Sequence, residues 1–267
     1  MELNGDNYYS IEANQEYMSV SQFKEFAGTF GRTGCEFQAV MKEKGEWEEK
    51  TSTPLIIGGY VDAFYEGTDS LERFKANNPI LFRNDGLLKA QYASAETVIL
   101  RTVKDSYFQK YMSGEKQRIM TGELFGSKWK IKMDSYIPNI CITDLKVMRS
   151  LTDTYRMPDG SRLDWVRYWG YDIQGAVYQE IVRQNTGRKL PFYIAAATKE
   201  EEPDIRIIEI TQNYLDEALR FVESKMPRVM AVKNGIVQPD HCEECNCCKH
   251  FRVLKAPISI SDLLSDY

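Results

Sequence analysis

The sequence predicts an α/β fold, because segments with strand periodicity and segments with helix periodicity follow one another along the chain. Residues 123–134 and 137–148 alternate β-branched or aromatic side chains with polar ones, which is typical of two strands joined by a turn. Residues 190–197 and 205–210 form a second apolar pair, and residues 163–186 repeat side chains at helical spacing. We therefore expect one large α/β domain, or such a domain with a small appendage.

The composition is that of a globular protein. Of 267 residues, 43% are hydrophobic and 27% are charged, and 17 Gly with 9 Pro exclude a collagen-like or low-complexity chain. The longest apolar runs, such as residues 192–197, are far shorter than the roughly 20 residues that cross a bilayer, so we expect no membrane contact. The first residues include acidic side chains and lack the pattern of a signal peptide. We expect a cytoplasmic protein.

The first half of the chain is expected to be mainly helical. Ser19 or Ser21 can cap a short helix. Apolar side chains at helical spacing predict further helices at residues 35–44 and 94–111. Residues 69–90, which lie between these helices, are expected to be rich in loops.

The second half is expected to carry two long helices. The first, at residues 163–186, should end at Gly187. The second begins after Thr211, which can cap it, and Pro227 should kink or interrupt it. The predicted strands at 190–197 and 205–210 lie between these helices.

Charge is distributed unevenly. The net charge of -5 argues against a protein that coats nucleic acid with its whole surface. Residues 101–132, in contrast, contain eight basic and three acidic side chains. A positively charged surface beside an acidic pocket is typical of an enzyme that binds phosphates and holds a metal ion. The alternative is a solvated helix face followed by an ordinary strand surface.

Two aspartates and a lysine form the pattern D-x9-D-x-K: Asp134, Asp144 and Lys146. Side chains alternate along a strand, so Asp144 and Lys146 should share one face, about 6 to 7 Å apart. Carboxylates on neighbouring strands can converge on one Mg²⁺. An ammonium group beside a phosphate can orient or help deprotonate a water and offset the charge of the transition state. The alternative is a structural ion pair.

Further motifs surround this pattern. Gly58-Gly59 and Asp62 precede it, and Gln174-x3-Tyr178 follows it on a predicted helix. In this order the motifs resemble those of the PD-(D/E)xK nuclease superfamily, most closely its RecB-like and RecE-like branch. That branch includes phage exonucleases related in architecture to lambda exonuclease.

The resemblance covers residues 19–249 and implies the fold in more detail. It implies a PD-(D/E)xK restriction-endonuclease-like core, with a central mixed β-sheet flanked by helices and a Cys-rich C-terminal tail. Residues 1–235 would then form the nuclease domain with an N-terminal helical lead-in. Residues 236–267 would form the tail.

The resemblance also implies roles for single residues. The expected metal ligands and the catalytic lysine are Asp134, Asp144, the carbonyl oxygen of Leu145, and Lys146. Gln174 and Tyr178 are expected to help hold DNA and to position the lysine or a phosphate. Asp62 stands where many relatives have a histidine, so either Asp62 or Glu66 could be a further metal ligand. The basic residues expected to contact DNA are Arg118, Lys128, Lys130 and Lys132.

Four of the six cysteines lie within seven residues near the C-terminus. Cys242-x2-Cys245-x2-Cys248 has the tight spacing of a site for a soft metal and needs a fourth ligand. The candidates for that ligand are Cys35, Cys247, His241 and His250. The resemblance implies a 4Fe-4S cluster with Cys35 as the first ligand, while the nearby histidines also make Zn²⁺ a candidate. The third alternative is a tail without a metal.

These observations together predict a Mg²⁺- or Mn²⁺-dependent DNA exonuclease of the phage recombination type. The resemblance implies that it acts on double-stranded DNA ends, forms a homo-oligomer and works with a RecT-like single-strand annealing protein. Two alternatives stay open. One is a non-catalytic DNA-binding module on the same scaffold, and the other is a structure-specific endonuclease.

Overall fold

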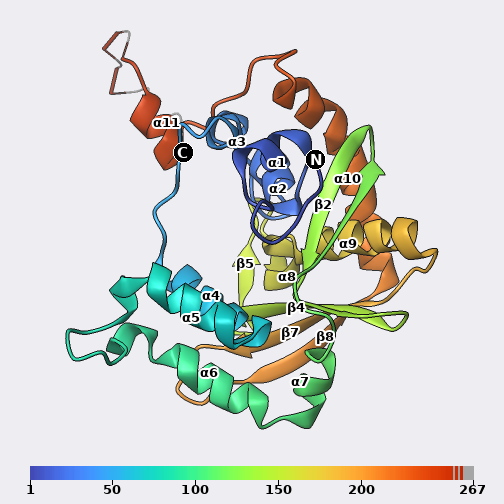
Figure 1. Cartoon of the computed structure of the whole chain (residues 1–267). Coiled ribbons are helices and arrows are strands. Elements are labelled where there is room, and N and C mark those ends of the chain that lie inside the picture. Colours follow the sequence, from blue (N-terminus) through green and yellow to red (C-terminus); the bar gives the residue numbers. More distant parts are fainter. Residues whose placement is uncertain (255, 258, 261–267) are drawn as a thin grey trace.

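The central element of the computed structural model is a four-stranded sheet, and the model describes residues 1–254, 256–257 and 259–260 (Figure 1). The strand order is β3 (Ser135–Ile137), β4 (Cys141–Met148), β7 (Phe192–Thr198) and β8 (Ile205–Ile210). β4 and β7 run parallel, whereas β3–β4 and β7–β8 are antiparallel. The sheet is therefore mixed, which confirms the predicted fold class. Residues 255, 258 and 261–267 of the predicted tail lie outside the described residues.

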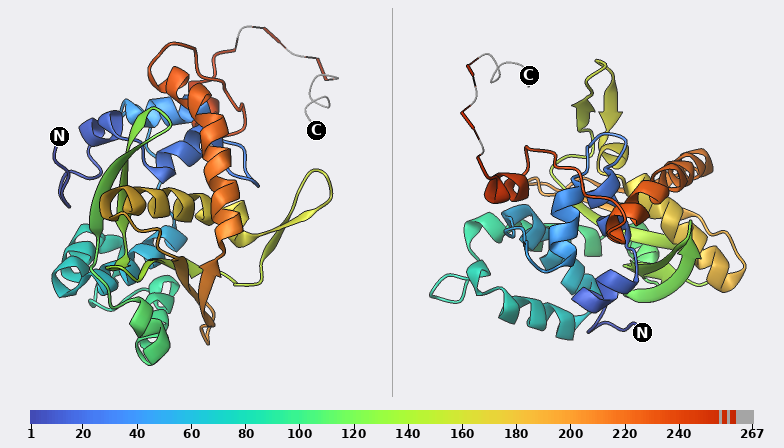
Figure 2. Two further views of the ribbon diagram at one scale, coloured as in Figure 1. Left: turned by 90° about the vertical axis from the view of Figure 1, so that its right-hand side faces the viewer. Right: turned by 90° about the horizontal axis from the view of Figure 1, so that it is seen from above.

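Helices and two strand ribbons surround this sheet. The α-helices are α1 (Ile11–Glu16), α2 (Val20–Ala27), α3 (Glu36–Glu43), α4 (Thr53–Glu66), α5 (Thr68–Asn77), α6 (Ser94–Val103), α7 (Ser106–Tyr111), α8 (Trp165–Tyr168), α9 (Tyr171–Thr186), α10 (Gln212–Lys233) and α11 (Asn246–Phe251). The ribbons pair β1 (Arg118–Leu124) with β2 (Ser127–Met133), and β5 (Thr154–Arg156) with β6 (Arg162–Asp164). Figure 2 shows the β5–β6 hairpin projecting from the body of the molecule.

The sheet separates two apolar cores. Ile142 of β4 and Ile194 of β7 belong to one core, and Leu145 and Ala195 of the same strands belong to the other. Helices α2, α9 and α10 lie on the first side and α4 and α6 on the second (Figure 1). The predicted alternation along β4 is confirmed. It directs Asp144 to the side that α9 covers.

The predicted hairpin between residues 123–134 and 137–148 is wrong in its pairing. Leu124 pairs with Ser127 across a turn in which Phe125 and Gly126 both have positive φ, 48° and 79°. A two-residue turn of this kind favours a tight hairpin, so β2 pairs with β1 and not with β4. Only the short β3 connects this ribbon to β4.

Two expectations for the first half of the chain also need correction. The predicted helix at 94–111 is divided into α6 and α7, because Asp105 caps α7 by accepting a hydrogen bond from the backbone N–H of Phe108 at 2.9 Å. The predicted loop at 69–90 contains most of α5.

The two long helices of the second half differ from the prediction in their details. The helix expected at 163–186 begins only at Tyr171, because Gly170 has a φ of 68° and separates α8 from α9. Pro227 lies inside α10, which continues without interruption to Lys233.

The predicted helix starts at Ser19 and Cys35 are confirmed. Ser19 and Gln22 form a reciprocal capping box at the start of α2, with N···O distances of 3.3 and 2.9 Å. The Cys35 sulfur accepts a hydrogen bond from the N–H of Gln38 at 3.4 Å and caps α3. The thiol of Cys35 is thereby held at the N-terminus of a helix.

A glycine allows α9 to lie close to β7. A Cβ atom at Gly175 would lie 2.7 Å from Cδ1 of Phe192 and 2.9 Å from Cδ2 of Leu215, and both side chains are buried. We expect Gly175→Ala to lower the free energy of unfolding by about 1–3 kcal/mol, because the added methyl group overpacks this contact. Urea denaturation measures the change.

Gly58→Ala is the matched control for Gly175→Ala. Gly58 lies inside α4, and a Cβ atom there would have no neighbour within 4 Å. Alanine should therefore raise the free energy of unfolding by about 0.5–1 kcal/mol through its higher helix propensity. A Gly175→Ala protein as stable as the wild type would contradict the close packing of α9 on β7.

In the part of the chain that the structure describes, no helix combines the length and the hydropathy needed to cross a lipid bilayer.

Candidate active site

Strand β4 carries the centre of the site. Asp144 is buried, and its Oδ2 forms an ion pair with Nζ of Lys146. Nζ of Lys146 also donates a hydrogen bond to the carbonyl oxygen of Leu145 at 3.1 Å. The period of two along the strand predicts this pairing, and the structure places both side chains as expected.

Asp134 lies where the β3–β4 ladder ends. The pairing of β3 with β4 ends at Ser135 and Thr143, so the N–H of Leu145, two residues further along β4, has no partner in β3. Oδ2 of Asp134 accepts a hydrogen bond from this N–H at 2.8 Å. Its Oδ1 accepts one from Gln117 at 3.5 Å. The carboxylate of Asp134 is therefore fixed beside the Asp144–Lys146 pair.

Burial and neighbouring charge disfavour the ionised forms of the acidic residues. Burial, followed by the charge of Asp144, raises the pKa of Asp134 to about 7, although Lys146 and the N–H of Leu145 act in the opposite direction. Burial, followed by the charge of Asp134, also raises the pKa of Asp62 on α4 well above its usual value. Three carboxyl groups thus share one buried region that favours the entry of a cation.

The structure favours Asp62 over Glu66 as the acidic residue of α4 in this region. The charges of Asp134, Lys146 and Asp144, and to a smaller extent that of Glu66, act on the pKa of Asp62, so its carboxyl group lies near the Asp144–Lys146 pair. Glu66 instead accepts a hydrogen bond from the hydroxyl of Ser70 on α5.

The ammonium group of Lys146 is held in its charged form. Burial alone would lower the pKa of Lys146, but the charges of Asp144 and Asp134 together outweigh it and raise the pKa. Nζ lies 5.0 Å from the ring centroid of Tyr171, the first residue of α9. Lys146 is therefore a fixed positive charge and hydrogen-bond donor at neutral pH.

Gln174 and Tyr178 of α9 form hydrogen bonds with Asp144 and with the backbone of β2, and not with Lys146 itself. Nε2 of Gln174 donates a hydrogen bond to Oδ1 of Asp144 at 2.6 Å. The hydroxyl of Tyr178 donates one to the carbonyl oxygen of Lys132 at 3.0 Å. Gln174 thus orients Asp144, and Tyr178 holds β2 against α9. That they help hold DNA and position the lysine or a phosphate stays a prediction, and both residues line a cavity beside the Asp144–Lys146 pair.

The four basic residues expected to contact DNA differ in exposure. Lys130 is buried at 1% exposure, and Nζ donates hydrogen bonds to the carbonyl oxygen of Tyr8 and, at 2.7 Å, to Oδ1 of Asn14. The prediction that Lys130 contacts DNA is therefore wrong, because its strand faces the N-terminal segment. Arg118 and Lys128 are exposed, and Lys132 is partly exposed.

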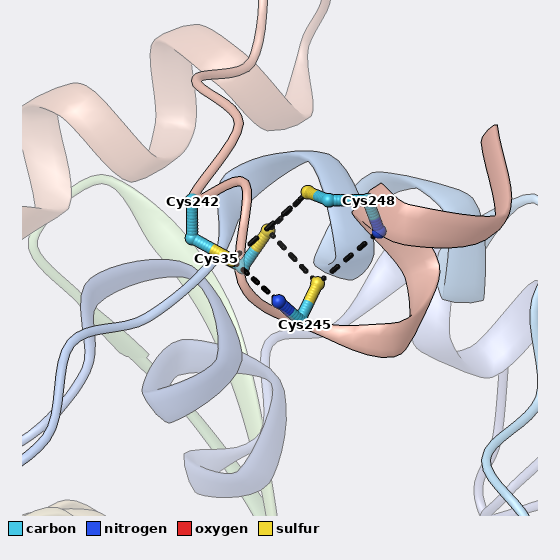
Figure 3. A group of neighbouring side chains, drawn as sticks. All are labelled: Cys35, Cys242, Cys245 and Cys248. Carbon is cyan, nitrogen blue, oxygen red and sulfur yellow. Dashed lines mark hydrogen bonds between the residues drawn. The ribbon is translucent and has the colours of Figure 1, made fainter. Parts of the chain in front are cut away.

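A second cluster lies away from the carboxylates, where four cysteine sulfurs converge (Figure 3). The Sγ atom of Cys35 is 3.6 Å from that of Cys248 and 3.7 Å from that of Cys245. The Sγ atoms of Cys242 and Cys248 are 4.0 Å apart. All four sulfurs lie within 4.8 Å of one another. The structure thus brings the predicted fourth ligand, Cys35, to the C-terminal triplet.

The alternative ligands near this cluster have other partners. The ring of His241 stacks on Phe37, with centroids 3.9 Å apart, and that of His250 lies against Trp47 at 5.4 Å. Cys247 is buried and is not among the four converging sulfurs.

The comparisons with known proteins agree with this architecture. The family described as "PDDEXK-like domain of unknown function (DUF3799)" matches residues 19–251. A crystal structure of a protein from Eubacterium rectale, named "Putative exonuclease", is 62% identical, covers 100% of both chains and has a TM-score of 0.96. None of the curated proteins matches the chain.

The chain belongs to the PDDEXK-like family. The recognised resemblance to PD-(D/E)xK nucleases is thereby confirmed. A further solved structure, that of SSO0001, is 12% identical to this chain and has a TM-score of 0.29. The match covers 72% of this chain and 84% of the SSO0001 chain, and the likeness is too weak to support an argument.

PDDEXK-like nucleases use divalent metal ions, and the residues present fit such an ion. The donors are hard carboxylate oxygens of Asp62, Asp134 and Asp144 with the carbonyl oxygen of Leu145. Oδ2 of Asp144 is buried and, among the described residues, accepts no hydrogen bond apart from its ion pair with Lys146. Such an oxygen can become a metal ligand without losing another partner.

Three residues near the site were missed by the sequence analysis as functional residues. Gln117 contacts Asp134, and the aromatic ring of Tyr171 lies beside both Lys146 and Lys24. Tyr171 shares a helical face with Gln174, so spacing offered a signal for it. No signal was available for Lys24 of α2 or for Gln117, because only long-range packing brings them here.

Proposed function

We propose that this PDDEXK-like chain is a metal-dependent DNA exonuclease that hydrolyses phosphodiester bonds of linear double-stranded DNA. The observation that carries the proposal is the buried Asp144–Lys146 pair on β4, with Asp134 held against the N–H of Leu145. A set of carboxylates beside a fixed ammonium group suits the binding and polarisation of a phosphate.

Separate residues of the site would bind the metal ion and the phosphate. Asp62, Asp134, Asp144 and the carbonyl oxygen of Leu145 would hold Mg²⁺ or Mn²⁺, and Gln174 would keep Asp144 in place. The bound ion would supply Lewis-acid stabilisation of the phosphate and activation of water. Lys146, which stays charged, would donate hydrogen bonds to the phosphate and offset the charge that develops there.

The substrate and the biological role are inferred from relatives. The 62% identical protein is named "Putative exonuclease", which supports attack from DNA ends. The resemblance to RecE-like and lambda-type enzymes supports a phage-type recombination role in the cytoplasm, a homo-oligomer and a RecT-like annealing partner. Arg118, Lys128 and Lys132 are proposed to contact the phosphate backbone.

The cysteine cluster is proposed to hold a metal centre that ties the C-terminal tail to α3. On a single tetrahedral ion with Zn–S bonds of about 2.3 Å, the sulfurs lie about 3.8 Å apart. The distances of 3.6, 3.7 and 4.0 Å match this spacing. In a 4Fe-4S cluster each cysteine binds a different iron, which places the sulfurs farther apart. The distances therefore favour one Zn²⁺-like ion.

Digestion of end-labelled linear duplex DNA and covalently closed circular DNA tests the proposed activity. We expect the protein to degrade the linear DNA only, with Mg²⁺ or Mn²⁺ but not with EDTA. Cleavage of the circular DNA would indicate an endonuclease. DNA binding without cleavage of either substrate would indicate a non-catalytic module on the same scaffold.

A further inference from the structure

Lys24 of α2 is a partly buried lysine without an acidic partner. Nζ donates a hydrogen bond to the carbonyl oxygen of Trp169 at 3.1 Å and lies 5.4 Å from the ring centroid of Tyr171. Within the described residues, no carboxylate forms an ion pair with it. Its neighbour Lys42, in contrast, pairs with Glu25 at 2.6 Å and with Glu49 at 2.9 Å.

Two further cations lie near Lys24, although the charges of Asp144 and Asp172 act on its pKa in the opposite direction. Lys146 lies against the same tyrosine ring, 5.0 Å from its centroid. Arg32 lies 4.5 Å from the ring centroid of Trp169. Burial, followed by the charge of Lys146, lowers the pKa of Lys24 to about 8. Burial of an ammonium group that forms no ion pair among the described residues costs free energy, and a bound anion would offset this cost.

Two cavities meet at Lys24. One, of about 310 Å³, is also lined by Lys132, Gln174 and Tyr178. The other, of about 630 Å³, is also lined by Arg32, Trp169 and Tyr171. The first cavity adjoins the Asp144–Lys146 pair through Gln174, which donates a hydrogen bond to Asp144. The second adjoins it through Tyr171, whose ring lies beside Lys146.

We propose that Lys24 is a second active-site lysine, which binds a backbone phosphate of the DNA strand next to the phosphate that is cleaved. This inference rests on the proposed function. Trp169 and Tyr171 line the same cavity, and their rings hold Arg32, Lys24 and Lys146 by cation–π contacts, so several cations face the space that the phosphate would enter.

Binding of a labelled linear duplex, measured by fluorescence anisotropy at several salt concentrations in buffer without divalent ions, tests the assignment. Lys24→Met should weaken binding about tenfold and reduce the slope of log Kd against log salt by about 0.9, the value for one phosphate contact. Lys24→Arg should keep the slope. Lys225→Met is the control, because Lys225 is an exposed lysine of α10.

Thermal unfolding separates this role from a structural one. Because Lys24→Met removes a charge without an acidic partner, its Tm should equal or exceed that of the wild type. Unchanged binding, or weaker binding together with a lower Tm, would overturn the assignment. Wild-type protein that fails to bind DNA would instead count against the proposed function itself.

Discussion

Replacing Lys146 by Ala is expected to lower the rate of linear DNA hydrolysis by about 10³-fold or more. Lys146 is the only one of the predicted catalytic residues whose charge is positive, and its ammonium group is fixed between Asp144 and the carbonyl oxygen of Leu145. Its removal takes away the positive charge that the protein places beside Asp144 to offset the charge of the transition state. The rate is measured with end-labelled duplex and saturating Mg²⁺.

Two further variants make this result specific to the charge of Lys146. Lys146→Gln keeps much of the side-chain length and should be as inactive as Lys146→Ala. Lys189→Ala removes an exposed lysine that pairs with Asp216 and should retain wild-type activity. Both Lys146 variants should still bind duplex DNA. Wild-type cleavage by Lys146→Gln would rule out a catalytic role for the ammonium group.

Replacing Cys245 by Ser is expected to remove the metal from the cysteine cluster and to release the tail. Wild-type protein should contain about one Zn²⁺ per chain by elemental analysis, and the variant should contain almost none. A structural Zn²⁺ contributes binding free energy of the order of 10 kcal/mol, which is lost with one thiolate. We therefore expect limited proteolysis to cut the variant within residues 236–251, while the central sheet stays folded.

Cys247→Ala is the matched control for Cys245→Ser. It removes a cysteine from the same segment but keeps all four converging sulfurs, so its metal content and protease resistance should resemble those of the wild type. Iron and inorganic sulfide with a visible absorption band would establish a 4Fe-4S cluster and contradict the single-ion assignment. Protein purified without any metal would contradict both.

The prediction of the active site from sequence was best where the evidence was local. Asp144 and Lys146 share a face because strand side chains repeat every two residues, and this follows from two positions of one strand. The capping box of Ser19 and Gln22 was also predictable, because the two residues that form it are only three positions apart in the sequence. The α/β class followed in the same way from the periodicity of single segments.

Turns were predicted less well than strands. The turn at Phe125 and Gly126 pairs β2 with β1, and the sequence analysis assigned this region to one long strand. As a consequence the antiparallel partner of β4 is the short β3, and Asp134 lies at the end of that ladder instead of inside it. The predicted proximity of Asp134 to Asp144 is nevertheless found, because the chain between them is short.

Local patterns were sufficient to predict the α/β class, the spacing of Asp134, Asp144 and Lys146, and the C-terminal cysteine triplet, because each depends on residues that are close along the chain. Long-range packing was needed to show that Lys130 is buried, that Lys24 lies beside Tyr171, and which of the candidate ligands joins the triplet, namely Cys35. Cys35 and Cys248 are separated by 213 positions. Their contact depends on how α3, α10 and the tail pack, and periodicity within one segment carries no information about such packing.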